Sequence, residues 1–90
     1  MFQTIRLIVE GKVQGVFYRQ STREKATAFG VSGTVKNLPD GNVEIIATGR
    51  AEQLQQLTQW CNQGPPRAVV TKVISTPLPL QSFKNFIIIR

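Results

Sequence analysis

The sequence contains no histidine, a single cysteine and few acidic residues. Histidine is the commonest general base and metal ligand in proteins, so its absence excludes a Ser-His-Asp triad and a typical zinc site. Cys61 has no partner for an internal disulfide, which agrees with a reducing compartment. No two of the acidic residues stand at the spacing of metal ligands: Glu10, Glu24, Asp40, Glu44 and Glu52. We therefore expect neither a bound metal nor a cofactor.

Long hydrophobic runs are missing too. No stretch reaches the roughly 18 apolar residues of a membrane span, and the N-terminus lacks the layout of a signal peptide. We therefore expect a cytoplasmic protein with no membrane contact. Hydrophobic residues form 41% of the 90 residues, and a chain of this length holds one core but not two. The prediction is one domain over residues 1–90, with a monomer as the default.

Positive charge is in clear excess. Lys and Arg number 11 against 5 Asp and Glu, which gives a net charge of +6. Such a field attracts anions, both nucleic acids and small molecules that carry phosphate. Charge alone slightly favours nucleic acid, because small basic domains often bind it. The choice between these ligands therefore depends on the motifs.

The hydrophobic pattern predicts strands and helices in alternation. Ser21 and Glu24 have the spacing of a capping box at a helix start, and Gly30 is typical of a helix end. Strands are expected at 4–10, 31–38, 43–47, 69–75 and 83–89, helices at 21–29 and 50–63, and a possible short extra piece at 77–80. The order β-α-β-β-α-β indicates an α+β protein, a ferredoxin-like α/β sandwich whose antiparallel sheet carries two helices on one face.

The second helix has a clear apolar face. Leu54, Leu57 and Cys61 recur at helical spacing, with Trp60 beside them. A free cysteine behaves as a small buried apolar residue. We therefore expect these four side chains in the core.

The loop from Gly11 to Arg19 is the best candidate for a functional site. Its glycines come just before a helix start, where backbone N–H groups and the positive end of the helix dipole can bind an anion. The charge of Arg19 opposes that dipole, and a bound anion would remove the conflict. Its planar guanidinium can also hold two phosphate oxygens. One such loop is a weak signal, so a plain loop with a solvated arginine stays open.

Two further features near this loop have alternative interpretations. Asn37 ends the second predicted strand, and its amide could orient a water molecule without carrying charge. It could equally serve only to form the turn over residues 37–41. Phe17 and Tyr18 could stack on a ligand, but we expect one of them to pack beneath the loop.

Two segments resemble the signatures of the acylphosphatase family. The stretch Gly11-Lys12-Val13-Gln14-Gly15-Val16-Phe17-Tyr18-Arg19 is similar to the first signature, in which V-Q-G-V, a variable residue and an aromatic precede an arginine. Residues 33–44, followed by Gly49, are similar to the second signature. Residues 60–66 and 86–90 also look like the family, so the resemblance covers nearly the whole chain. One position departs from the pattern, because Thr34 stands where the family usually has an aromatic.

The resemblance implies an enzyme that hydrolyses the carboxyl–phosphate bond of a small-molecule acyl phosphate without a metal. In that family role, Arg19 would bind the phosphoryl group and Asn37 would position the attacking water. The backbone N–H groups of the loop would cradle the same phosphate oxygens: Gln14, Gly15, Val16, Phe17 and Tyr18. Thr34 could loosen packing or alter substrate contacts near this site.

Two alternatives remain open at this point. RNA-recognition domains share the order of elements, but they place aromatics on central strands, and residues 31–38 and 43–48 contain none. We therefore expect no nucleic-acid partner. Acylphosphatase-like domains also occur inside larger proteins that handle carbamoyl phosphate, and turnover of carbamoyl phosphate alone would favour such a regulatory relative.

Overall fold

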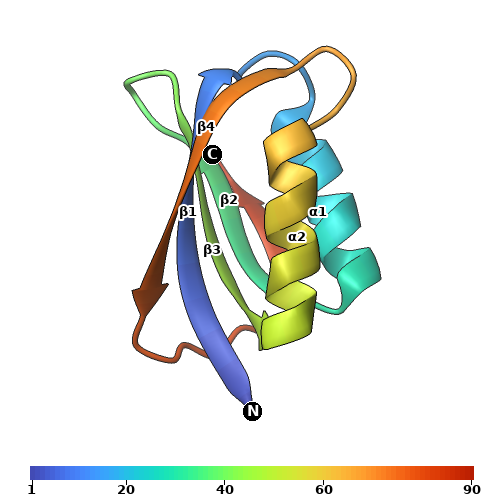
Figure 1. Ribbon diagram of the computed structural model, residues 1–90, viewed down its shortest axis with the longest axis vertical. Helices are drawn as coiled ribbons and strands as arrows, with labels where there is room; N and C mark the ends of the chain where they lie inside the picture. Colours follow the sequence, from blue (N-terminus) through green and yellow to red (C-terminus); the bar gives the residue numbers. More distant parts are fainter.

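The computed structural model describes every residue from Met1 to Arg90. The elements follow in the order β1 (Phe2–Lys12), α1 (Tyr18–Phe29), β2 (Ser32–Asn37), β3 (Val43–Arg50), α2 (Ala51–Gln63), β4 (Val69–Leu78) and β5 (Phe86–Ile89). The strands form one sheet in the order β4-β1-β3-β2-β5, and both helices lie on the same face of it (Figure 1). This arrangement is the predicted ferredoxin-like α+β sandwich.

One strand pairing differs from the predicted antiparallel sheet. Strands β1, β3 and β4 pair antiparallel, as do β2 and β3, whereas β5 lies parallel to β2. The cause is the connection after β4, which crosses to the other edge of the sheet and brings β5 in at the end where β2 begins. The register runs from Gly33 beside Phe86 to Lys36 beside Ile89. The C-terminal ends of β2 and β5 therefore lie together.

Several strand boundaries differ from the sequence prediction, and the largest differences are in β1, β3, β4 and β5. Strand β3 continues to Arg50, beyond the predicted residue 47. Strand β1 is longer at both ends than the predicted 4–10. Strand β4 continues through Pro77 to Leu78, so the first half of the expected extra piece at 77–80 is the end of β4. A proline is tolerated there because β4 is an edge strand. Strand β5 starts at Phe86, later than the predicted residue 83.

The capping box predicted for the first helix is wrong. Phe17 adopts a left-handed conformation, with φ 65°, and turns the chain directly into α1 at Tyr18. Ser21 therefore lies inside the helix, and its N–H donates to the Phe17 carbonyl at 3.0 Å. The carboxylate of Glu24 accepts a bond from Gln20 Nε2 at 3.1 Å and does not reach back to a cap. The helix thus follows the loop without a side-chain cap.

The core lies between the sheet and the helices. On α2, Leu54, Leu57 and Cys61 are buried as predicted, while Trp60 is half-buried and packs against the core. The sheet contributes alternate residues of its strands, because successive side chains point to opposite faces. These strand residues include Leu7, Val9, Val35, Val43, Ile45 and Ala47.

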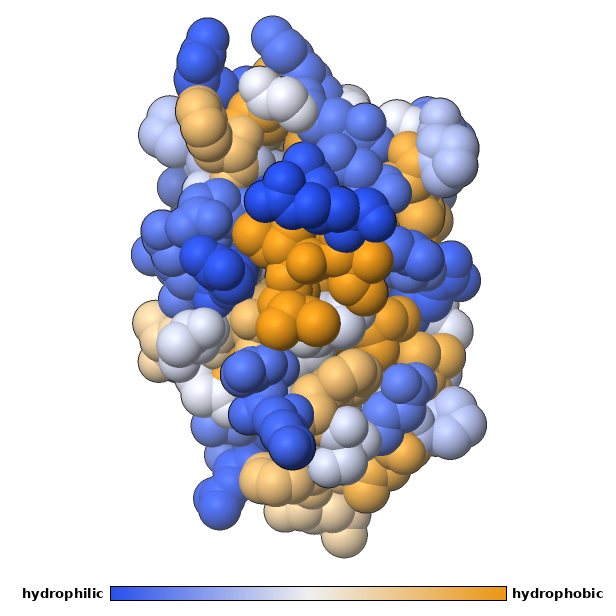
Figure 2. Space-filling model, turned by 180° about the vertical axis from the view of Figure 1, so that it is seen from behind, coloured by the Kyte–Doolittle hydropathy of each residue, from blue (hydrophilic) through white to orange (hydrophobic).

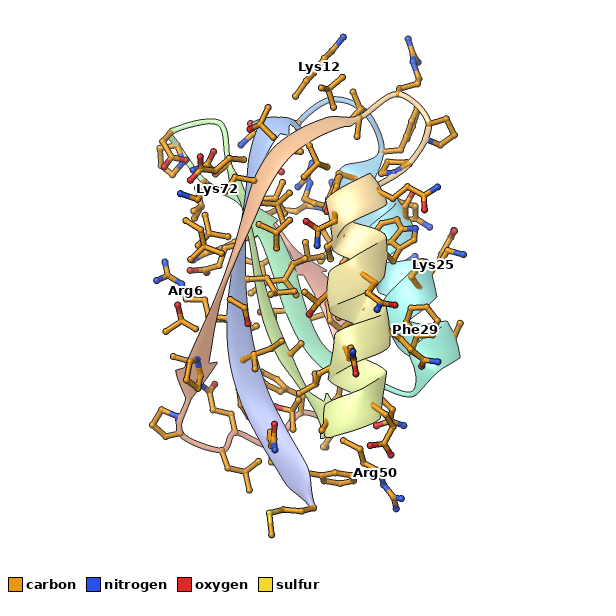
Figure 3. All side chains as sticks on the ribbon, viewed as in Figure 1. Arg6, Lys12, Lys25, Phe29, Arg50 and Lys72 are labelled. Carbon is orange, nitrogen blue, oxygen red and sulfur yellow. The ribbon has the colours of Figure 1, made fainter.

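The surface carries its positive charge on several sides. Figure 3 shows Arg6 and Lys72 projecting from the sheet, Lys25 from α1, and Lys12 and Arg50 near opposite ends of the molecule. From behind, hydrophobic side chains gather in the middle of the face, with hydrophilic ones around them (Figure 2). The exposed apolar residues of the protein include two from strand β5, Ile87 and Ile89. Neither helix is long and apolar enough to cross a membrane.

Candidate active site

The loop over residues 13–17 joins β1 to α1 at the end of the molecule that also holds the β2–β3 turn (Figure 1). Val13 and Val16 anchor the loop, since both side chains are buried in the core. Gly15, between these two valines, and Phe17, directly after Val16, both adopt left-handed backbone conformations, with φ 74° and 65°. A Cβ on Gly15 would meet no atom within 4 Å, so this part of the backbone faces open space.

The backbone donors of this loop have no partner. None of the N–H groups from Gln14 to Gln20 donates a bond to a backbone carbonyl, and the first helical bond runs from Ser21 to Phe17. The first turn of α1 contains no acidic residue, so no side chain neutralises the positive end of its dipole. Left-handed Phe17 is unusual for a residue with a side chain, and such conformations cluster at functional sites. The loop therefore presents a run of free donors suited to an anion.

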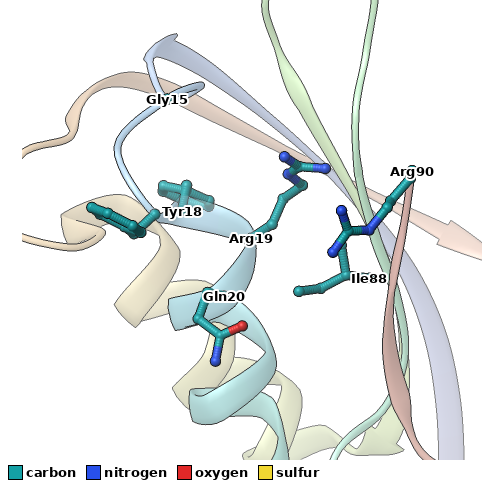
Figure 4. A pocket seen from close by; sticks show the side chains of 7 residues that line it. Gly15, Tyr18, Arg19, Gln20, Ile88 and Arg90 are labelled. Carbon is teal, nitrogen blue, oxygen red and sulfur yellow. The ribbon is translucent and has the colours of Figure 1, made fainter.

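Arg19 sits in the first turn of α1, half-buried and without an acidic partner. The ion pairs of the protein both belong to Glu44, which contacts Arg6 at 2.8 Å and Lys36 at 3.7 Å. The side chain of Arg19 extends from the helix toward the end of β5 (Figure 4). The predicted conflict between its charge and the helix dipole is therefore present in the structure. An anion between the loop and the guanidinium would satisfy both.

A pocket of about 330 Å³ opens beside Arg19. The sequence prediction named four of its lining residues but missed the rest, and it also named Gln14, Val16 and Asn37, which do not line it. The missed residues come from the first turn of α1 and the end of β5, which only the tertiary structure joins. The complete lining of the pocket consists of Gly15, Phe17, Tyr18, Arg19, Gln20, Ile88 and Arg90. No three His, Cys, Asp or Glu side chains come together anywhere in the chain to hold a metal.

Asn37 ends β2 on the face that the helices cover. It shares this face with Val35, two residues earlier, which is fully buried against the core. Its Oδ1 is buried and has no hydrogen-bond partner. An unsatisfied buried acceptor costs about 1–3 kcal/mol, so a donor such as a bound water would stabilise it. The register of β2 and β5 ends at the pair of Lys36 and Ile89, so Asn37 and Arg90 each follow the last paired residue of their strand.

The turn after Asn37 forms without its side chain. The Leu38 N–H donates to Asn42 O at 2.8 Å, and the Gly41 N–H donates to Leu38 O at 3.1 Å. The carboxylate of Asp40 accepts bonds from both the backbone and the side-chain nitrogen of Asn42. The interpretation of Asn37 as a turn-forming residue therefore finds no support in these bonds.

Gln14 connects the loop to this turn. Its Nε2 donates to Leu38 O and to Asn42 O, each at 2.8 Å. The sequence prediction assigned Gln14 only a backbone role, and no local pattern indicates a contact between residues so far apart in the chain. The side chain holds the free donors of the loop in place relative to Asn37.

Tyr18 is the aromatic that packs beneath the loop, while Phe17 is 69% exposed. The Tyr18 hydroxyl donates to Cys61 O at 2.7 Å, and its ring lies 5.6 Å from that of Trp60, centroid to centroid. Burial raises the pKa of the Tyr18 phenol well above its usual value, so the hydroxyl stays a donor. Burial likewise raises the pKa of Cys61 to about 12. These contacts tie the start of α1 to the end of α2.

Thr34, the departure from the family pattern, lies away from these groups. It pairs with Ile46 on β3 and with Ile87 on β5. Because it neighbours buried Val35, its side chain points to the face of the sheet opposite the helices. The substitution therefore affects the open face of the sheet and not the side that carries Asn37.

Together, the fold and the site define a two-layer α+β protein with a loop of unpartnered backbone donors at the start of its first helix. The acylphosphatase family profile matches residues 5–88. An acylphosphatase of Marinobacter nauticus is 54% identical over 81 residues, which cover 89% of this chain and 88% of that protein. The chain therefore belongs to the acylphosphatase family of hydrolases.

Solved structures agree with this assignment. The crystal structure of an acylphosphatase from Bacillus subtilis is 35% identical with a TM-score of 0.95, covering 100% of both chains. An acylphosphatase structure from Coxiella burnetii is 39% identical with a TM-score of 0.94, covering 97% of this chain and 92% of that one.

Proposed function

We propose that residues 1–90 act as one domain that hydrolyses the carboxyl–phosphate bond of acyl phosphates to a carboxylate and inorganic phosphate. Arg19 and the N–H groups from Gln14 to Tyr18 bind the phosphoryl oxygens, and Asn37 orients the attacking water. The observation that carries the proposal is the run of unpartnered donors at the start of α1, next to an arginine without an acidic partner. These groups all supply positive charge to one place.

The chemistry of an acyl phosphate suits such a site. The carboxylic acid of the leaving group has a pKa of roughly 4 to 5, so it departs as the anion and needs no general acid. Phosphoryl transfer passes through a loose transition state, so the water needs orientation more than a strong base. What remains is to position the reactants and stabilise charge on the equatorial oxygens. Arg19, the loop amides and Asn37 provide these functions without a metal.

The position of Asn37 supports its role with the water. Its Oδ1 is buried without a partner and can accept a hydrogen bond from a water molecule. Gln14 ties the loop to the turn that follows Asn37, so the water on Asn37 and the phosphoryl group on the loop keep a fixed distance and orientation. The Asn37 amide carries no charge and therefore does not repel the anionic substrate.

The test is an assay of benzoyl phosphate hydrolysis in the presence of a chelator. We expect turnover by the unmodified chain and a large loss in Arg19→Ala and Asn37→Ala, with both variants folded by circular dichroism. We also expect little turnover of an alkyl phosphate, whose leaving group needs protonation. A folded, unmodified chain that leaves benzoyl phosphate intact would overturn the proposal. Comparable rates on the alkyl phosphate would refute the argument from the leaving group.

A further inference from the structure

The pocket beside Arg19 contains a second cation. Arg90 follows β5, and its guanidinium faces the pocket from the side opposite the start of α1 (Figure 4). Neither arginine forms an ion pair with an acidic side chain or with the chain terminus. No acidic side chain lines the pocket. Two like charges on one small cavity repel each other, so the free pocket favours occupation by negative charge.

The lining of the pocket is partly apolar. Ile88 lies two residues before Arg90 on the same face of β5, and the largely exposed Phe17 also lines the pocket. The pocket thus combines two cations with carbon side chains. Such a pattern matches an organic molecule with an anionic group at both ends of a short carbon skeleton.

We propose that Arg90 is a specificity-determining residue, which binds a second anionic group on the acyl part of the substrate and so selects acyl phosphates that carry one. The inference rests on the proposed function, because it requires Arg19 and the loop to hold the phosphoryl group. The acyl carbons then lie along Ile88 and Phe17. A carboxylate or a second phosphate at the far end contacts the guanidinium of Arg90.

The test compares two substrates of equal size that differ in charge, para-carboxybenzoyl phosphate and para-carbamoylbenzoyl phosphate. The measured quantity is the ratio of their kcat/KM values. We expect the unmodified chain to favour the carboxylate by roughly tenfold, the typical worth of a hydrogen bond to a charged group. In Arg90→Gln the ratio falls roughly tenfold, toward one. Lys84→Gln removes the same charge from the segment before β5, outside this pocket, and keeps the ratio of the unmodified chain.

Each other outcome is decisive. A ratio near one in the unmodified chain would overturn the inference while leaving the hydrolysis of acyl phosphates in place. An equal loss of kcat/KM on both substrates in Arg90→Gln would overturn it too, since Arg90 would then hold the transferred phosphoryl group. Absence of turnover of either substrate by the unmodified chain would refute the proposed function itself. Thermal unfolding of Arg90→Gln shows whether the exposed substitution leaves the fold intact.

Discussion

Replacing Arg19 with glutamine should raise stability and abolish most of the activity. The arginine lies in the first turn of α1, where no acidic residue offsets the helix dipole and no carboxylate pairs with the guanidinium. A charge of the wrong sign at a helix end costs about 0.3–1 kcal/mol. Arginine and glutamine have similar helix propensities, so the substitution removes this cost without adding another. Because Arg19 is only half-buried, we expect a gain of about 0.5 kcal/mol.

Thermal unfolding at low ionic strength measures this gain. For a chain of this size, a change of 1 kcal/mol shifts the melting temperature by about 4–8 °C, so Arg19→Gln should melt about 2–4 °C higher than the unmodified chain. The difference should shrink in high salt, which screens the dipole interaction. Added phosphate should stabilise the unmodified chain more than the variant, because the anion needs the guanidinium.

The kinetic effect should have the opposite sign. An arginine that stabilises a transferred phosphoryl group contributes on the order of a thousandfold to the rate, so kcat/KM for benzoyl phosphate should fall by about that factor in Arg19→Gln. A matched variant, Arg23→Gln, removes the same charge from an exposed position one turn further along α1 and should keep its activity. A loss of more than about 1 kcal/mol of stability in Arg19→Gln would refute the reasoning, because the arginine would then have a structural role.

Three further predictions follow from single contacts. Asn37→Ala should lower kcat about a hundredfold with little change in KM if its unpartnered Oδ1 positions the attacking water as proposed. A rise in KM alone, measured by steady-state kinetics, would contradict this role. Gly64→Ala should destabilise the fold by about 1–3 kcal/mol, since its Cβ would come 2.9 Å from the Tyr18 ring at a φ of 69°. Gly41→Ala, at a φ of 95° with no atom near its Cβ, is the matched control and should cost less in urea unfolding. Burial raises the pKa of Cys61 from 9.0 to about 12. The contribution of this thiol to the free energy of unfolding should therefore be complete below pH 9 and decrease as the pH rises toward 12. Cys61→Ala should remove that part of the decline, and an unchanged pH profile would contradict it.

Local patterns were enough to predict most of the elements. Alternating apolar residues predicted the strands, and the spacing of Leu54, Leu57 and Cys61 predicted the buried face of α2. The start of α1 was mispredicted because the capping-box spacing at Ser21 is a local signal, whereas the loop before the helix is held by Val16 in the core and by left-handed Phe17. At the position where the candidate site begins, tertiary packing and not the local capping pattern therefore determines where the helix starts.

The sequence by itself determined the fold class, and it predicted the candidate loop before α1 with the candidate residues Arg19 and Asn37, because these depend on periodicity and on motifs contiguous in the chain. Only the tertiary structure decided how distant segments meet. It set β5 parallel to β2, which brings Arg90 into the pocket of Arg19. It also directed the Gln14 side chain to the β2–β3 turn. Strand order and crossovers join residues far apart in the chain, and no short-range pattern specifies those contacts.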